Sequence, residues 1–345
     1  MQLCQNLRGG NQLGINVLIT SAGRRVSLIK AFKKAIEKRN GTLYAGDMDE
    51  LAPSLYFADK KVKLYEVLHE NYIFQLLEIA EREKINLIVP TIDTELMILS
   101  KNANLFKGIN CKVLVSGEKL VQIANDKWET VVFFNNYNIK TPRSWIRDTL
   151  NEDELPDILF VKPRGGSASK HTYKVNKKNL SKVIDLVPEP IIQEYLNYPE
   201  ITIDCLLDME GRIIHYVPRM RLKAIGGESV EGITIPDDDI RSWILRVLNI
   251  ISSIGGIGPI TIQAFLTDHG PILSEINPRF GGGVPLTFAA GGDYPEWILQ
   301  MLEGNEVAPR IGCYKKHLCM TRFYQELFID KSTLGETVNE KRSGI

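Results

Sequence analysis

The sequence SEINPRFGGG at residues 274–283 alternates polar and apolar side chains and then runs into glycines. Along a strand every second side chain lies on the same face, so Glu275 and Asn277 point the same way, and Gln263 on the preceding strand could join them across the ladder. Three such oxygen donors suit Mg²⁺, which completes its octahedron with water and phosphate oxygens. Arg279 follows on the same side, where it could neutralise a phosphate. A polar strand end with a structural Arg–Glu pair is the alternative explanation.

A second run, LFVKPRGGSASKH at residues 159–171, places a lysine at the end of a strand and small residues directly after it. Backbone N–H groups approach phosphate oxygens closely only where side chains are small, and Lys162 adds a point charge. The run is not a P-loop, because the Gly-x-x-x-x-Gly-Lys-Ser/Thr order is missing and residues 172–175 read as a strand. The pattern predicts a polyphosphate-binding loop, with a plain hairpin turn as an equal alternative.

A third region reads IIQEYL at residues 191–196 and EITID at residues 200–204. An apolar strand that ends in a short connection offers backbone N–H and C=O groups to an adenine edge. A carboxylate shortly beyond Glu194 could bind ribose hydroxyls. Taken alone, the pattern also fits an ordinary hairpin.

These runs, in this order and with Asp126-Lys127-Trp128 ahead of them, resemble the ATP-grasp superfamily, and in particular a single synthetase unit of the carbamoyl-phosphate synthase large chain. The likeness extends from about Ile15 to about Arg322 and is specific for the superfamily rather than for a substrate. Two departures stand out. The chain has one such unit where carbamoyl-phosphate synthase has two, and Gln263 replaces an acid that many ATP-grasp ligases place there.

The resemblance implies a role for each residue of these runs. Lys127 and Lys162 would contact the phosphates of ATP, and Arg279 would stabilise the transferring phosphoryl group. The remaining roles are a lid over the phosphates (Gly165, Gly166, Ser167 and Ser169), an adenine-binding strand end (Gln193, Glu194, Tyr195 and Leu196), a ribose ligand (Glu200) and the ligands of one or two Mg²⁺ ions, with Mn²⁺ as a substitute (Gln263, Glu275 and Asn277).

The chain ahead of these runs alternates between strand and helix patterns. A β-branched run at residues 15–20 is followed by apolar residues at helical spacing, and the alternation continues to residue 115, which predicts a parallel sheet covered on both faces. After Asp126 strands outnumber helices, as in an α+β unit. We therefore expect an α/β N-terminal domain with a parallel sheet, the pre-ATP-grasp domain of the family, and then an α+β ATP-grasp domain with antiparallel sheets. The expected bounds are a loose tail at 1–14, the first domain at 15–120, the second at 121–310, and a C-terminal segment at 311–345 that packs on the second.

The composition narrows the classes of partner. Of the 345 residues 44% are apolar, and 42 basic residues balance 42 acidic ones, so no overall field favours nucleic acid as a partner. No apolar run approaches the ~20 residues that span a bilayer, so we expect no membrane association. The five cysteines have no Cys-x-x-Cys spacing, which argues against a zinc knuckle or a disulfide framework and favours the cytoplasm.

Two further segments lie outside the nucleotide motifs. PRMRLKAIGGES at residues 218–229 packs three cations into five residues, which could hold a carboxylate or a phosphate, and we assign Arg221 a catalytic role toward the acceptor substrate. An edge strand protected by its charges is the alternative. Asp93-Thr94-Glu95 follow a strand end where open parallel sheets bind ligands, and these acids could hold an ammonium group or favour a helix N-terminus.

The resulting hypothesis is an ATP- and Mg²⁺-dependent carboxylate–amine ligase. It would activate a small-molecule carboxylate as an acyl phosphate and couple it to an amine, an amino acid among the candidates. An enzyme that releases an acyl or carbamoyl phosphate is one alternative, and a non-catalytic nucleotide-binding protein is another. A Rossmann dehydrogenase is excluded because Gly-x-Gly-x-x-Gly is missing after the first strand. A homodimer is left open.

Overall fold

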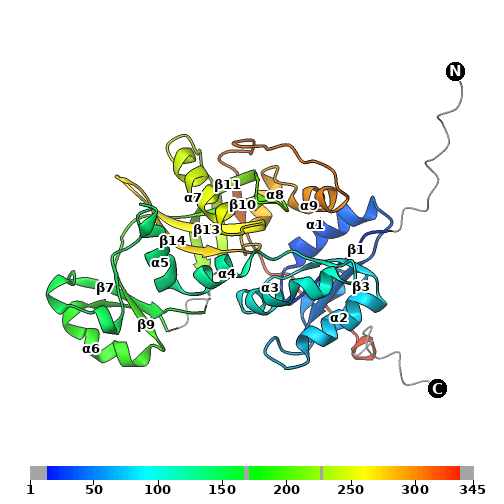
Figure 1. Ribbon diagram of the computed structural model, residues 1–345, viewed down its shortest axis with the longest axis horizontal. Coiled ribbons are helices and arrows are strands. Elements are labelled where there is room, and N and C mark those ends of the chain that lie inside the picture. The colour runs from blue at the N-terminus through cyan, green and yellow to red at the C-terminus, as the bar shows by residue number, and fades with distance from the viewer. Residues whose placement is uncertain (1–13, 167–170, 226–227, 335–345) are drawn as a thin grey trace, which may run out of the picture. The chain divides into compact units, whose positions relative to one another are not determined.

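The computed structural model describes residues 14–166, 171–225 and 228–334 (Figure 1). Nearly all of the predicted tail at 1–14 and part of the predicted lid, Ser167 and Ser169, lie outside these ranges. The described residues divide into two compact units, unit 1 with residues 14–89, 105–112 and 329–334 and unit 2 with residues 90–104 and 113–328. The expected domain limits at 120 and 310 both fall inside unit 2. In these three ranges every helix is too short or too polar to span a bilayer.

Unit 1 is built on a parallel sheet with the strand order β3-β2-β1-β4-β5, in which β1 pairs in parallel with both β2 and β4. Helix α1 forms because its apolar side chains recur at helical spacing, and five of them are buried: Leu28, Ile29, Phe32, Ala35 and Ile36. The predicted alternation is confirmed by β1 (Asn16–Ile19), α1 (Val26–Glu37), β2 (Leu43–Asp47), α2 (Tyr72–Arg82), β4 (Ile85–Val89), α3 (Asp93–Lys107) and β5 (Lys112–Val113), whereas β3 (Lys60–Lys63) was not predicted. The first residues of α3 belong to unit 2 and its last turn to unit 1.

Unit 2 contains two sheets whose paired strands are antiparallel, as predicted. The larger has the order β14-β13-β10-β11-β12-β15 and the smaller has the order β6-β9-β7-β8. Their strands are β6 (Ser144–Trp145), β7 (Ile158–Pro163), β8 (Tyr173–Asn176), β9 (Pro190–Glu194), β10 (Glu200–Leu207), β11 (Ile213–Ile225), β12 (Glu228–Thr234), β13 (Gly258–Thr267), β14 (Gly270–Asn277) and β15 (Cys319–Thr321).

In the sequence, two helices of unit 2 precede the strands of its sheets and the other helices lie between those strands. They are α4 (Glu118–Asn125), α5 (Lys127–Asn136), α6 (Leu180–Val183), α7 (Arg241–Ser253), α8 (Val284–Ala289) and α9 (Tyr294–Leu302). Short 3₁₀ helices in the two units are η1 (Pro53–Tyr56), η2 (Arg147–Thr149), η3 (Glu152–Glu154), η4 (Lys177–Asn179), η5 (Ile184–Leu186) and η6 (Lys331–Thr333).

The larger sheet has one apolar face and one polar face. Ile201, Ile203 and Cys205 of β10 belong to a buried cluster with side chains from β13, β14 and α7, and Figure 1 shows α7 beside these strands. The residues between them, Thr202 and Asp204, point to the opposite face because side chains alternate along a strand. Because the apolar side chains pack against α7, the alternate side chains of each strand lie on the opposite, polar face of the sheet.

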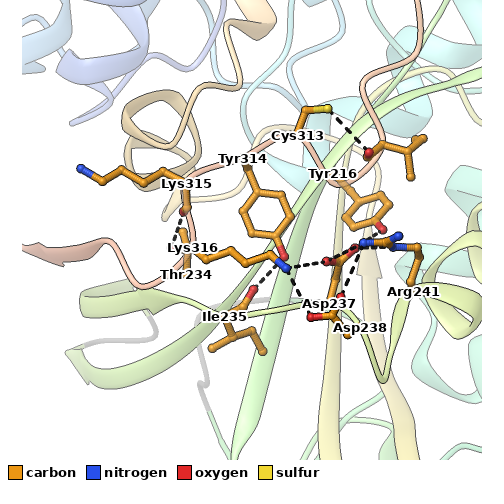
Figure 2. A network of polar contacts seen from close by, with 11 residues as sticks. Tyr216, Thr234, Ile235, Asp237, Asp238, Arg241, Cys313, Tyr314, Lys315 and Lys316 are labelled. Atoms are coloured by element: carbon orange, nitrogen blue, oxygen red, sulfur yellow. Dashed lines mark hydrogen bonds and ion pairs between the residues drawn. The ribbon is translucent and has the colours of Figure 1, made fainter.

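A buried carboxylate fastens the C-terminal part of unit 2 to this sheet (Figure 2). Asp237 accepts hydrogen bonds from the Tyr216 hydroxyl at 2.6 Å and from Arg241 Nε at 2.8 Å, and Lys316 Nζ lies 3.7 Å from its other oxygen. Burial would raise the pKa of Asp237, but the hydrogen bonds from Arg241 and Tyr216 outweigh burial and lower it to about 2. The segment that carries Lys316 continues into β15, which pairs with β12 at the end of the sheet.

Candidate active site

The polar face of the larger sheet brings the three predicted metal ligands together. The strand register sets Gln263 directly opposite Glu275, and it sets Asn277, two positions along β14, opposite Thr261. Neighbouring strands lie about 4.8 Å apart, so side chains paired in this way share one small area of the face. The predicted grouping of Gln263, Glu275 and Asn277 is thus present in the fold.

The donor chemistry of this group fits a hard cation. It offers one carboxylate and two amide groups, which supply the oxygen ligands that Mg²⁺ prefers. Among the described residues, no cluster of three or more His, Cys, Asp or Glu could hold a metal ion. A metal here would therefore receive its negative protein charge from Glu275 and two further oxygen ligands from the amides. Phosphate oxygens and water would complete its coordination.

Lys162 is the second-last residue of β7 in the smaller sheet, and it interacts electrostatically with Glu275 of the same group. Its side chain is only 8% exposed. Burial lowers its pKa to about 8, a shift that Lys127 strengthens and that Glu275 and Glu200 oppose. Lys162 thus lies in the combined field of residues from β10, β14 and α5, which shows that the two sheets converge on one charged region.

Lys127 and Asp126 anchor the start of the glycine-rich loop. Lys127 Nζ donates to the carbonyl oxygen of Gly166 at 2.8 Å and to that of Arg164 at 3.3 Å. Asp126 caps α5 by accepting from the backbone N–H of Trp128 at 2.8 Å, and it also binds Arg164 Nη2 at 2.6 Å. Gly166 has a φ of +81°, which glycine adopts without strain. Asp126 and Lys127, at the start of α5, therefore both bind the residues at the start of the glycine-rich loop.

The predicted adenine strand uses its side chains for local structure. The carboxylate of Glu194 accepts from the backbone N–H and from Nε of Arg143, both at 2.9 Å. Gln193 is buried and donates to Ser144 Oγ at 2.8 Å, and the ring of Tyr195 has a lysine ammonium 3.7 Å from its centroid. Leu196 follows the strand and is partly buried. The side chains of residues 193–195 thus already have neighbours within the protein, and the first two of these residues end β9.

Two residues with separate predicted roles form one ion pair. Arg221 Nη1 lies 2.6 Å from Glu200 Oε1, and the two side chains are 17% and 32% exposed. Strand β11 pairs with both β10 and β12, so the alternative of a protected edge strand is wrong. Exposure increases along β11 from buried Arg219 to exposed Lys223, and Arg221 lies between these extremes.

A second ion pair beneath this face has no counterpart among the sequence predictions. Arg219 Nε donates to Asp204 Oδ2 at 2.8 Å, and both side chains are 3% exposed. Thr287 donates to the same oxygen at 2.8 Å. A Cβ atom at Gly283 would lie 2.3 Å from Cζ of Arg219, so the glycine run packs directly against this pair. The polar residues alternating along β10, together with the glycines, are the sequence signals that could have indicated it.

Arg279 is held by a residue that the sequence placed in a different role. Its Nε and Nη2 atoms donate to the two carboxylate oxygens of Asp93 at 2.8 and 2.7 Å. Asp93 follows the end of β4 and is the first residue of α3, so the sequence predicted its position in the fold correctly. Its carboxylate nevertheless binds a guanidinium rather than a free ammonium group.

Two family models match separate parts of the chain. One describes a PylC-like N-terminal domain and matches residues 17–114. The other describes an ATP-grasp in a biosynthetic pathway with the Ter operon and matches residues 187–320. A comparison with curated proteins gives no significant match.

Solved structures of low sequence identity share the fold. The biotin carboxylase domain of 2-oxoglutarate carboxylase from Hydrogenobacter thermophilus, in complex with MgADP, ADP and bicarbonate, is 14% identical with a TM-score of 0.72, over 90% of this chain and 74% of that one. N5-carboxyaminoimidazole synthetase from Staphylococcus aureus, complexed with ADP, is 18% identical with a TM-score of 0.69, over 89% and 82%. L-amino acid ligase from Bacillus licheniformis is 17% identical with a TM-score of 0.66, over 86% and 77%. The predicted fold class and the resemblance to the ATP-grasp superfamily are confirmed.

Proposed function

We propose that this chain, which is an ATP-grasp protein, binds ATP with Mg²⁺, phosphorylates a small-molecule carboxylate and couples the acyl phosphate to an amine. The observation that carries the proposal is the convergence of Lys162 with Glu275 and Glu200, since a buried cation beside a hard-metal donor group suits a polyphosphate. The solved relatives that contain ADP, and the one named as an amino acid ligase, support it.

In the proposed reaction, a carboxylate oxygen of the substrate attacks the γ-phosphorus, the bond to the β-phosphate oxygen breaks and ADP leaves. Lys127 and Lys162 hold the phosphates, and Arg279 stabilises the charge that develops on the transferring group. When bound at Gln263, Glu275 and Asn277, Mg²⁺ supplies Lewis-acid neutralisation of the phosphate oxygens. The amine nitrogen then attacks the acyl carbon, loses a proton and expels phosphate. The loop after Lys162 shields the acyl phosphate from water.

A screen of carboxylates and amines tests this function. Purified protein is incubated with ATP, Mg²⁺ and pairs of acids and amines, amino acids first, and phosphate release is followed. We expect release that needs both an acid and an amine and that gives an amide. Release with an acid alone, accompanied by an acyl phosphate product, would instead identify an enzyme that stops at the activated intermediate. No turnover of ATP with any pair would reduce the protein to a nucleotide-binding role.

The buried Lys162 predicts proton uptake when nucleotide binds. Its pKa of about 8 leaves most molecules neutral at pH 9, whereas a bound phosphate favours the ammonium and raises that pKa. Binding should therefore take up about one proton at pH 9 and about a quarter of one at pH 7.5, and affinity should fall as pH rises above about 8. Calorimetry of a non-hydrolysable ATP analogue with Mg²⁺, in buffers of different ionisation enthalpy, measures this uptake.

The matched control is Lys162→Ala, which removes the titrating group. Proton uptake at pH 9 should disappear, and affinity at pH 7.5 should weaken by roughly 1.5 to 3 kcal/mol, the scale of a charge-assisted hydrogen bond. Equal uptake by the variant and the original protein would assign the proton to another group and remove Lys162 from the phosphate site.

Arg221 is proposed to act on the acceptor substrate. Arg221→Ala should lower kcat/KM for the acceptor by about two orders of magnitude, near 2.7 kcal/mol, with ATP affinity nearly unchanged. Glu200→Gln is the informative control, because it removes the ion-pair partner that we assign to the ribose and should raise the KM for ATP instead. If Arg221→Ala raises the KM for ATP as Glu200→Gln does and changes the acceptor kinetics less than about fivefold, Arg221 serves only to hold Glu200.

A further inference from the structure

The guanidinium of Arg279 is almost fully engaged by neighbouring oxygens. Besides its two bonds to Asp93, its Nη2 donates to Asn277 Oδ1 at 3.3 Å and its Nη1 donates to the carbonyl oxygen of Phe280 at 3.2 Å. A guanidinium has five N–H donors. Within the described residues, these four contacts use four of the donors and leave one Nη1 hydrogen, so the plane and the direction of the guanidinium are set before any ligand binds.

Asp93 contributes the strongest part of this restraint. A bidentate carboxylate–guanidinium pair fixes both the position and the rotation of the planar group, which a single hydrogen bond does not. The pair is little exposed, at 13% for Arg279 and 19% for Asp93, so solvent screens it less than a surface pair. The contact to Asn277 also ties the same guanidinium to the predicted metal ligands.

We propose that Asp93 is a positioning residue for phosphoryl transfer, which holds Arg279 so that its remaining N–H donor meets the transferring group in the transition state. The inference rests on the proposed function. Asp93 partly neutralises Arg279, so the arginine adds little to the binding of ground-state nucleotide and acts on charge that develops later.

The neighbouring acid of the same segment shows a different arrangement. Glu95 is completely buried, and its Oε2 accepts from the backbone N–H of Thr91 at 3.3 Å. That contact lies within the turn that starts α3 and is a local structural one. The carboxylate of Asp93, by contrast, binds Arg279, which follows β14 in the sequence.

The test compares ADP·Mg²⁺ with ADP·Mg²⁺ plus aluminium fluoride, which imitates the transferring phosphoryl group, by calorimetry. Asp93→Ala and Arg279→Ala should each leave ADP·Mg²⁺ affinity within about threefold and lower the additional affinity gained with aluminium fluoride by about 30- to 100-fold. The double variant should be no weaker than Arg279→Ala, because Asp93 acts through that arginine. Asp93→Asn, which keeps one acceptor oxygen, should fall between Asp93→Ala and the unchanged protein.

Asp185→Asn is the matched control, since it removes an exposed ion pair with Arg147 of similar length, 2.6 Å, in the same unit. It should bind both ligands as the unchanged protein does. Equal weakening of both ligands in Asp93→Ala would indicate a purely structural pair, and unchanged aluminium fluoride binding would also overturn the proposal. If the unchanged protein binds no ADP·Mg²⁺, the proposed function itself fails. If the unchanged protein binds ADP·Mg²⁺ and the Asp93 variants gain as much affinity with aluminium fluoride as it does, this inference alone fails.

Discussion

Glu275→Ala should abolish turnover while leaving the protein folded. Glu275 is the only carboxylate in the predicted metal group, and a metal's stabilisation of phosphoryl-transfer charge is worth several kcal/mol, so the expected loss is about a thousandfold or more. Glu275 also favours the charged form of buried Lys162, so its removal weakens the nearest cation as well. Phosphate release from ATP over a Mg²⁺ titration, together with Mn²⁺ binding followed by paramagnetic resonance, measures both effects.

Two further variants separate charge from packing at this position. Glu275→Gln keeps the size of the side chain and loses its charge, and it should be nearly as inactive as Glu275→Ala. Glu231→Gln, on the same sheet, removes a carboxylate whose contact with exposed Lys223 is 3.8 Å long, and it should retain full activity. Normal turnover in a well-folded Glu275→Ala protein would refute the assignment of the metal group.

Arg279→Ala should lower kcat by about 10² to 10³ and change the KM for ATP little, because loss of one preorganised charged donor acts mainly on the transition state. Arg279→Lys should not restore the rate, since an ammonium cannot make the two parallel bonds to Asp93 that orient the guanidinium. Steady-state kinetics with the acid and amine found by the screen provide the measurement. A raised KM with an unchanged kcat would make Arg279 a ground-state ligand of ATP.

Much of the fold follows from apolar periodicity. Helix α2 runs from Tyr72 to Arg82 as its spacing predicts, because one face of it is buried. Strand β3 was missed because its sequence, KKVK, buries a single residue and offers no apolar pattern. Strand β15 was missed because three residues are too few to show alternation, and its place is set by pairing with β12 rather than by its own sequence.

In the candidate site, too, the sequence predicts contacts between residues that are close in the chain and misses those between residues that are far apart in it. Spacing along one strand predicts that Glu275 and Asn277 share a face, and the cross-strand register adds Gln263. The partner of Arg279 lies 186 residues away, and no pattern within either segment indicates that pairing. The buried pair of Arg219 and Asp204 was missed because its residues look like ordinary charged strand positions until both neighbouring strands are in place.

The position of β15 in the sequence has a consequence for biosynthesis. A ribosome releases β12 well before the residues that pair with it, so during synthesis the larger sheet has an open edge at β12. Such an edge can pair with another nascent chain, and closing the intervening loop costs conformational entropy that local contacts do not offset. During the same interval the carboxylate of Asp237 lacks its ion pair with Lys316, which has not yet been synthesised. The edge at β12 is therefore covered only after the residues of β15 have been synthesised, which makes pairing of β15 the last step in assembling the larger sheet.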